Sequence, residues 1–249
     1  MQKPHLILIH GFPLDGSFWQ PQVEALSAVA HVHAPDLRGF GGDRQELPTA
    51  MTMEAYAEDL RNLMDREGIA RAVLCGLSMG GYVAMAFAER WPERLQGLVL
   101  CNTRATADTD EGRAAREQTA RDAHAKGPEV IARAMVPKVL SERTRRDRPE
   151  VAARIEAIMS SQSPEAIAAA ARGMALRPDR HEVLAALDVP ALIITGSDDL
   201  LMPLETSQSM FHVMKRCELV VIEGAGHLAS AEAPDTFNET LLDFLRDLK

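Results

Sequence analysis

A serine stands where an apolar strand is predicted to turn into an apolar helix, in the stretch VLCGLSMGGYVAMAFAER. The spacing G-L-S-M-G at residues 76–80 is typical of a sharp turn that exposes a nucleophilic serine hydroxyl. Glycines flank the serine because such a turn leaves little room for side chains. The motif predicts nucleophilic catalysis by Ser78, with the backbone N–H of Met79 as a donor to an oxyanion. The alternative is a glycine-rich turn that serves packing alone.

A serine hydroxyl becomes a strong nucleophile only when a base accepts its proton. Of the eight histidines, His227 differs because it lies on a glycine-rich loop, GAGHLASAEAP, after the last predicted strand. A loop at that end of a strand can place an imidazole over the serine, and this makes His227 the predicted base. The alternative is an ordinary surface histidine.

A carboxylate must then hold the imidazole in the tautomer that accepts the proton. The stretch PALIITGSDDLLMP supplies Asp198 and Asp199 directly after the preceding predicted strand. The order along the chain is serine, aspartate, histidine, as in hydrolases that carry this serine motif. The residues alone leave the choice between the two aspartates open.

A second oxyanion donor is predicted in LILIHGFPLDGSFW, where a glycine-containing turn follows the first strand. The N–H group of Phe12 is favoured, because Pro13 has no N–H to donate. Phe12 and Met79 would then act together on the same oxyanion.

The elements that position these residues alternate along the chain. Short apolar runs without polar alternation suit strands of a parallel sheet that is covered on both faces. These runs are HLILIHG, HVHAPDLRG, RAVLCGLS, LQGLVLCNT, PALIITG and CELVVIEG. Stretches of helical period lie between or after them, at residues 17–27, 53–67, 81–90 and 233–248. The alternation predicts an α/β fold, with helices on both faces of an open sheet.

The alternation stops between Thr103 and Leu187, in a region rich in Ala, Arg and Glu. Amphipathic helices are predicted there at residues 110–126, 128–135, 149–160 and 164–175, and a proline begins each of the last three. We expect this insert to be a lid over the carboxyl ends of the strands, where open α/β sheets bind ligands. The alternative is a helical bundle unrelated to any site. The predicted domains are a core at residues 1–103 and 188–249 and a cap at residues 104–187.

Five stretches of the chain resemble motifs of the α/β-hydrolase superfamily and occur in the same order. The resemblance covers essentially the whole length of the chain. The five stretches are HGFPLDGSFW, DLRGFGGD, GLSMGGYVA, GSDDLLMP and GAGHLASAEAP. The resemblance implies Asp199 as the acid, because the family places it three residues after the glycine of the GSDD-type turn. It also points to Phe12 as the oxyanion donor and to Trp19 as an aromatic residue packed near that loop, where it is a candidate for contact with the substrate.

Within the superfamily, CGLSMGG followed by LVLCNTRA is most similar to the 3-oxoadipate enol-lactonase-like esterases and to related small carboxylesterases. The sequence begins on the strand before the oxyanion loop, so the family's leading strand pair is expected to be absent. We therefore expect a mostly parallel sheet of about six strands, with the run from Val32 to Asp36 at its edge.

Four further residues are candidates for contact with the substrate. Arg104, shortly after LVLCNT, is placed to meet a substrate carboxylate, and a surface arginine is the equal alternative. Met135, Met159 and Met174 lie on apolar faces of the predicted cap helices. Methionine adapts to varied shapes, so these side chains would suit a tolerant apolar pocket, whereas the alternative is plain core packing.

Composition narrows the class of protein. With 249 residues, 46% of them hydrophobic, the chain can bury a full core, while its net charge of −9 disfavours binding to nucleic acid. No run of about 18 apolar residues predicts a membrane span, and no signal peptide is recognised, so we expect a cytoplasmic protein with reduced cysteines. There is no H-E-x-x-H or clustered ligand spacing, and no nucleotide-binding glycine motif, so no metal ion or cofactor is expected.

The predicted activity is that of a serine hydrolase, which cleaves small, fairly apolar carboxylic esters or lactones through an acyl-serine. Alternatives are the same triad acting on a thioester or a carbon–carbon bond, or forming peracids as perhydrolases do. A non-catalytic ligand receptor on this fold would be expected to lack a triad member. The predicted partner is a small-molecule ester, and the choice between monomer and homodimer stays open.

Overall fold

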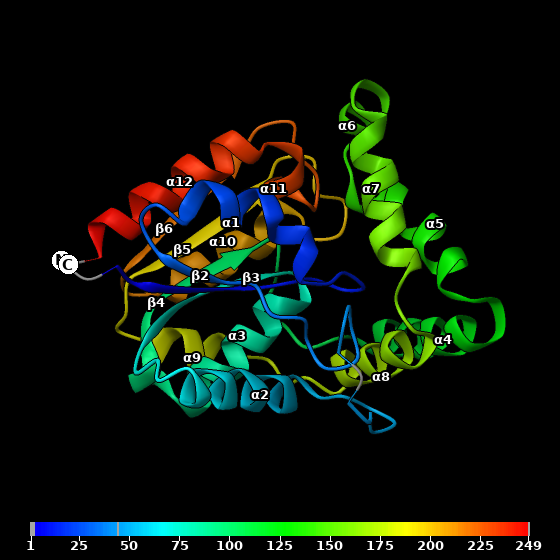
Figure 1. The fold of residues 1–249 in the computed structure, drawn as a ribbon, viewed down its shortest axis with the longest axis horizontal. Helices are drawn as coiled ribbons and strands as arrows, with labels where there is room; N and C mark the ends of the chain where they lie inside the picture. The colour runs from blue at the N-terminus through cyan, green and yellow to red at the C-terminus, as the bar shows by residue number, and fades with distance from the viewer. Residues whose placement is uncertain (1–2, 44, 249) are drawn as a thin grey trace.

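The computed structural model describes residues 3–43 and 45–248, and a single six-stranded sheet organises them (Figure 1). All neighbouring strands pair in parallel, in the order β2-β1-β3-β4-β5-β6. The strands are β1 (His5–Ile9), β2 (His31–His33), β3 (Ala72–Leu77), β4 (Leu95–Cys101), β5 (Ala191–Gly196) and β6 (Cys217–Ile222). The predicted α/β class and the six-stranded parallel sheet are confirmed.

The edge strand β2 is shorter than the run from which it was predicted. It pairs with β1 over His31–His33 only. Pro35 follows closely and has no N–H to give to a strand ladder, so pairing ends before residues 34–36. The run lies at the edge of the sheet, as expected.

Helices cover both faces of the sheet (Figure 1). One face carries α2 (Met53–Arg66), α3 (Met79–Arg90), α9 (His181–Ala186) and α10 (Leu204–Val213), and the other carries α1 (Gln20–Leu26) and α12 (Pro234–Asp247). Helix α3 is buried on all sides, whereas α12 buries one apolar stripe. On α12 the stripe is Phe237, Leu241 and Leu245, four residues apart, which is the spacing of one helix face. Two short 3-10 helices, Gly16–Trp19 and Pro92–Arg94, precede α1 and β4.

Five further helices stand beyond the carboxyl ends of the strands (Figure 1). They are α4 (Asp110–Lys126), α5 (Pro128–Val139), α6 (Glu142–Asp147), α7 (Pro149–Ser160) and α8 (Pro164–Ala175). The bounds of α4, α7 and α8 are those predicted. Helix α5 extends past its predicted end at Met135 and includes Pro137, whose missing N–H removes one helical bond without ending the helix. The remaining helix of the insert, α9, packs on α3 and α10 of the core.

The five helices, which we call the cap, dock on the core through α8. The amide of Met51 donates a hydrogen bond to the carbonyl of Ala169 at 2.9 Å. A Cβ atom on Gly173 would lie 1.7 Å from the carbonyl oxygen of Met51, so only glycine permits this approach. Within the cap, Arg172 of α8 forms a 2.9 Å ion pair with Glu117 of α4. The cap is thereby seated closely on one side of the sheet's carboxyl edge.

Candidate active site

Ser78 lies on the turn between β3 and α3, in a backbone conformation that few side chains adopt. Its φ of 52° and ψ of −112° are outside the helical and extended regions. Neighbouring glycines make the turn possible: a Cβ on Gly76 would lie 2.3 Å from the Gly80 carbonyl oxygen, and one on Gly80 would lie 2.2 Å from that of Ile9. The Thr103 hydroxyl donates a 2.7 Å hydrogen bond to the Ser78 carbonyl and steadies the turn.

The structure joins three of the predicted side chains in one hydrogen-bonded chain. Nε2 of His227 lies 2.9 Å from Oγ of Ser78, and Nδ1 of His227 lies 2.8 Å from Oδ2 of Asp199. These contacts span 149 and 28 residues of sequence, and they meet where the loops after β3, β5 and β6 converge. Asp198 is exposed instead and accepts a bond from Ser197, so Asp199 is the aspartate that faces the imidazole.

Asp199 is buried yet favours its ionised form. Burial by itself raises the pKa of this carboxyl, but the charge of His227 and hydrogen bonds from His227, Asn102 and the Met202 amide outweigh burial, so the pKa lies below its usual range. The amide of Leu201 adds a further hydrogen bond, at 2.8 Å. An ionised carboxylate is what an imidazole that must become positively charged requires.

Asn102 is a site residue that the sequence interpretation missed. Its Nδ2 donates to Oδ2 of Asp199 at 2.9 Å and to the carbonyl of Gly226 at 3.2 Å. Its φ of 45° is left-handed, a conformation that asparagine tolerates better than most residues. The only signal in the sequence is its place directly after β4, at the edge where the other site residues gather.

The predicted oxyanion donors lie on either side of Ser78. Met79 is the first residue of α3, so its N–H has no acceptor within the helix. The loop that carries Phe12 touches the serine, because a Cβ on Gly11 would lie 3.3 Å from Cβ of Ser78. Buried His10 braces this loop through a 3.0 Å contact between its Nδ1 and the Gly11 carbonyl. Whether the two amides receive an oxyanion stays a prediction.

A cavity of about 460 Å³ opens onto the serine and the histidine. The cap supplies most of its wall, from α4, α5 and α8. Its lining residues are Phe12, Ser78, Arg104, Asp108, Gly112, Ala115, Arg116, Gln118, Thr119, Asp122, Ile131, Ala134, Met135, Lys138, Met174, Leu201, Met202 and His227. Three of the predicted substrate contacts, Arg104, Met135 and Met174, are among them.

The other two predicted substrate contacts, Trp19 and Met159, require correction. Trp19 is fully buried, with its ring 5.0 Å from that of Phe18 and 6.0 Å from that of Phe237. Met159 is fully buried in the same apolar layer, on the side of α7 that faces the core. Neither lines the cavity beside Ser78. Both are core residues, because the apolar face of a helix or turn packs against the nearest apolar layer.

Three arginines converge on Asp108 in the cavity wall. Oδ1 accepts hydrogen bonds from Arg104 at 2.5 Å and Arg177 at 2.9 Å, and Oδ2 accepts one from Arg116 at 3.2 Å. Burial raises the pKa of Asp108, but the bond from Arg177 and the charges of Arg116 and Arg177 outweigh it and lower the pKa from 3.8 to about 2. We call these four residues the Asp108 cluster.

Asp108 is expected to make stability depend on pH. Because its folded pKa of about 2 lies below its ordinary value of 3.8, folding favours the ionised form. That contribution, about 2 kcal/mol by linkage, is complete above about pH 5 and is lost as the pH falls through about 2. Urea unfolding should therefore show that Asp108→Asn costs most at pH 7 and progressively less towards pH 3. Asp110→Asn, at an exposed position of α4, is the control and should show no such trend. A cost for Asp108→Asn that is the same at both pH values would contradict this assignment.

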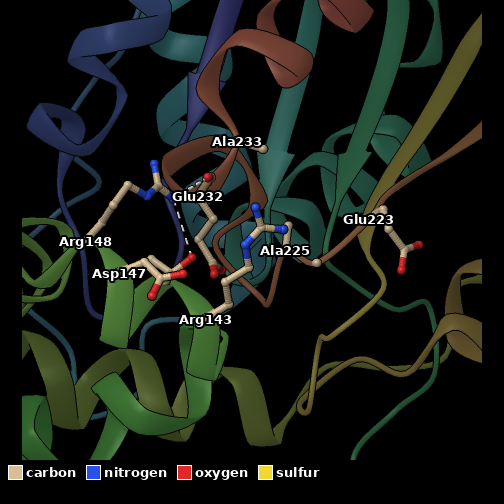
Figure 2. Close-up of a pocket in the computed structure, with 9 residues that line it drawn as sticks. Arg143, Asp147, Arg148, Glu223, Ala225, Glu232 and Ala233 are labelled. Atoms are coloured by element: carbon tan, nitrogen blue, oxygen red, sulfur yellow. Dashed lines mark hydrogen bonds between the residues drawn. The ribbon is translucent and has the colours of Figure 1, made fainter.

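Glu232 of α11 (Ala229–Glu232) links the histidine loop to the cap and was also missed. Its Oε1 accepts from the Gly226 amide and its Oε2 from the Ser141 amide, both at 2.9 Å. The Leu228 amide adds a 3.1 Å bond to the carbonyl of Val139 in α5. Figure 2 shows Glu232 in the wall of a second cavity, of about 270 Å³, with Arg148 donating to its carbonyl. Glu232 ties Gly226 to the cap and the Leu228 amide makes its own tie, so the residues on both sides of His227 are held relative to the cap.

Glu232→Gln is expected to lower kcat about 10-fold and to lower the Tm. The new NH₂ group faces a backbone N–H where an oxygen accepted a bond, so either Gly226 or Ser141 loses its partner and His227 shifts. Ester hydrolysis and thermal unfolding measure the two effects. Glu223→Gln, at an exposed position of the same segment, should leave both unchanged. Identical kcat and Tm in Glu232→Gln and the original protein would show that this carboxylate positions nothing.

Among residues 3–43 and 45–248, no helix is long and apolar enough to cross a membrane. Within the same described ranges, no group of three or more His, Cys, Asp or Glu side chains is arranged to hold a metal ion.

Comparison with known proteins gives a consistent picture. A family model described as the alpha/beta hydrolase fold matches residues 4–234. A thermophilic esterase from Thermogutta terrifontis, solved with malate bound, is 41% identical, with a TM-score of 0.96 over 99% of this chain and 91% of its own. The enol-lactonase from Burkholderia xenovorans LB400 is 30% identical, with a TM-score of 0.91 over 99% and 93%. A protein of Azorhizobium caulinodans, named provisionally as the carbamate hydrolase RutD, is 30% identical over 98% of this chain and 91% of its own.

Proposed function

The chain belongs to the α/β-hydrolase fold family, and from that premise we propose that it is a serine hydrolase of carboxylic esters or lactones. The observation that carries the proposal is the hydrogen-bonded chain from Ser78 through His227 to Asp199. The similar proteins named as an esterase and an enol-lactonase support the choice of bond.

In the first half of the reaction, Oγ of Ser78 attacks the ester carbonyl carbon while Nε2 of His227 takes the hydroxyl proton. The carbonyl π electrons move to oxygen, and the tetrahedral oxyanion is stabilised by the N–H groups of Phe12 and Met79. The oxyanion then collapses, the bond from carbon to the alcohol oxygen breaks, and His227 gives its proton to the leaving alcohol. The product of this half is an acyl-serine.

In the second half, water replaces the alcohol. His227 takes a proton from water as the water oxygen bonds to the acyl carbon, and the returning proton goes to Oγ of Ser78 as the acid leaves. Asp199 stays ionised throughout and stabilises the imidazolium in both halves. The overall reaction consumes one water and yields one acid and one alcohol, so it requires no cofactor.

The cavity favours a substrate with a small acyl or alcohol group over one with a long chain, because its volume of about 460 Å³ suits a compact ligand. Met135 and Met174 give part of its wall an adaptable apolar surface. Thioesters and carbon–carbon bonds remain alternative targets for the same three side chains.

Two measurements test the proposal. Hydrolysis of p-nitrophenyl esters of increasing acyl length should be measurable and should favour short chains, and thioester and diketone substrates in the same assay separate the alternatives. A fluorophosphonate probe should add one phosphonyl group per chain, which peptide mass spectrometry should locate on Ser78. Labelling of another residue, or no labelling at all, would contradict the assigned nucleophile.

A further inference from the structure

The wall of the active-site cavity carries a surplus of positive charge. Its positively charged lining residues are Arg104, Arg116 and Lys138, and its negatively charged ones are Asp108 and Asp122. Both carboxylates also pair with cations from outside the lining. Asp122 forms a 3.1 Å ion pair with Lys126, and Asp108 one of 2.9 Å with buried Arg177. Arg104, Arg116, Lys138, Lys126 and Arg177 thus share two carboxylates, which leaves positive charge in excess.

Arg177 is buried and fixes the position of Asp108 within the Asp108 cluster. Its guanidinium donates to the carbonyls of Met174 and Thr106 as well as to Asp108, and it stacks 4.1 Å from the centre of the Tyr82 ring. Its side chain is 1% exposed, so it presents nothing to a ligand. Arg177 instead holds Asp108, and Asp108 holds the other two arginines.

Arg104 and Arg116 keep donors for a ligand. Their side chains are 28% and 24% exposed, and both line the cavity. One bond to Asp108 fixes the position of each side chain. A guanidinium carries a fork of N–H groups, so one bond to Asp108 leaves further donors on each residue. Nε of Arg104 is buried and has no partner among the described residues. The donors of Arg104 that can meet a ligand are therefore its Nη groups.

The two arginines also lie within reach of the reacting bond. Arg104 directly follows Thr103, whose hydroxyl bonds the Ser78 carbonyl, and one cavity includes Arg104, Arg116, Ser78 and His227. A compact substrate with its ester at Ser78 therefore places its other end against the Asp108 cluster.

We infer that the substrate carries a carboxylate, which is bound by Arg104 and Arg116 while Ser78 attacks an ester elsewhere in the same molecule. The planar guanidinium group of an arginine can form two parallel hydrogen bonds to a carboxylate. Two such residues facing one cavity would attract the negative charge and also fix the orientation of the carboxylate. This inference rests on the proposed hydrolase activity and replaces the expectation of a fairly apolar substrate with an anionic one.

The test compares esters that differ only in charge. Ethyl half-esters of succinic, glutaric and adipic acid carry the carboxylate on the acyl side, and acetoxyacetate carries it on the alcohol side. For each ester the control is the primary amide in place of the carboxylate, which has nearly the same shape but no charge. At pH 7.5 we expect kcat/KM to favour the charged member of at least one pair by about 10-fold or more, and the preference to shrink as salt is added.

Variants assign that preference to the two arginines. Arg116→Gln and Arg104→Gln should each lower the ratio of kcat/KM for the charged ester to that for its amide by about 10-fold. Arg113→Gln removes an exposed arginine of the same helix α4 that does not line the cavity, and it should preserve the ratio. Thermal unfolding checks that each variant is folded. Because Arg116 is partly exposed, its variant remains informative even if Arg104→Gln fails to fold.

The outcomes separate this inference from the activity on which it rests. Equal kcat/KM for charged and amide esters in every pair, or an unchanged ratio in Arg116→Gln, would overturn the carboxylate site while leaving the hydrolase intact. Full activity in a Ser78→Ala variant would overturn the hydrolase mechanism itself. A charge preference that vanishes in the arginine variants and persists in Arg113→Gln supports the inference.

Discussion

Replacing Ser78 with alanine is expected to lower kcat for ester hydrolysis by about 10⁴-fold or more. The substitution removes the only atom that forms the acyl bond, while the small side chain fits the strained turn between β3 and α3. Binding should change little, because the cavity and the predicted oxyanion donors stay in place. Residual hydrolysis above the uncatalysed rate would come from those donors and from His227. Steady-state and single-turnover measurements with a p-nitrophenyl ester give the comparison.

A serine on a surface helix supplies the matched control. Ser209 of α10 is exposed, and Ser209→Ala removes the same atom far from the cavity. It should hydrolyse esters at the original rate. If Ser78→Ala retained even a tenth of the original kcat, the acyl-serine mechanism would have to be abandoned.

Asp199→Asn is expected to lower kcat by about 10⁴-fold and also to lower the Tm, because the new NH₂ group faces the Nδ2 donor of Asn102. Asparagine can keep a hydrogen bond to Nδ1 of His227, but its NH₂ group favours the tautomer in which Nδ1 accepts. Nε2 then carries the proton and cannot take another from Ser78. The variant also loses the negative charge that stabilises the imidazolium in both halves of the reaction.

The neighbouring aspartate makes the test specific. Asp198→Asn removes the same charge one residue away, at an exposed position whose side chain bonds only Ser197 among the described residues. It should preserve kcat within about twofold, and both variants are compared in the same ester assay. Equal losses in the two variants would mean that general negative charge on this loop matters, rather than contact with the imidazole.

Much of the fold follows from local signals in the sequence. The helices α7 and α8 begin at prolines, α4 begins directly after the capping residue Thr109, and all three have the predicted bounds. The strands were found because parallel strands buried on both faces read as continuous apolar runs. Glycines on both sides of Ser78 indicated the turn, because the close approach of β3 and α3 excludes side chains there.

Residues that act only through distant contacts were not predictable in this way. Glu232 bonds an amide 91 residues earlier, and Asn102 bonds a carboxylate 97 residues later. No spacing within one segment encodes such a contact. Trp19 and Met159 were placed in the pocket wrongly for a related reason: an apolar residue on a helix or turn is equally suited to a core and to a cavity wall. The Asp108 cluster draws its members from three separate segments of the cap region, and its convergence became visible only in three dimensions.

The joint between Glu232, Gly226 and Ser141 limits how this enzyme can be re-engineered. A chimera that exchanged residues 104–187 for the equivalent segment of a relative would separate Ser141 from its acceptor and would disturb the loop that holds the base. Grafts that also carry residues 223–233 would transfer the two parts as a matched pair. Diversification of specificity in this scaffold therefore has a natural unit of exchange, which is discontinuous in the gene but contiguous in space.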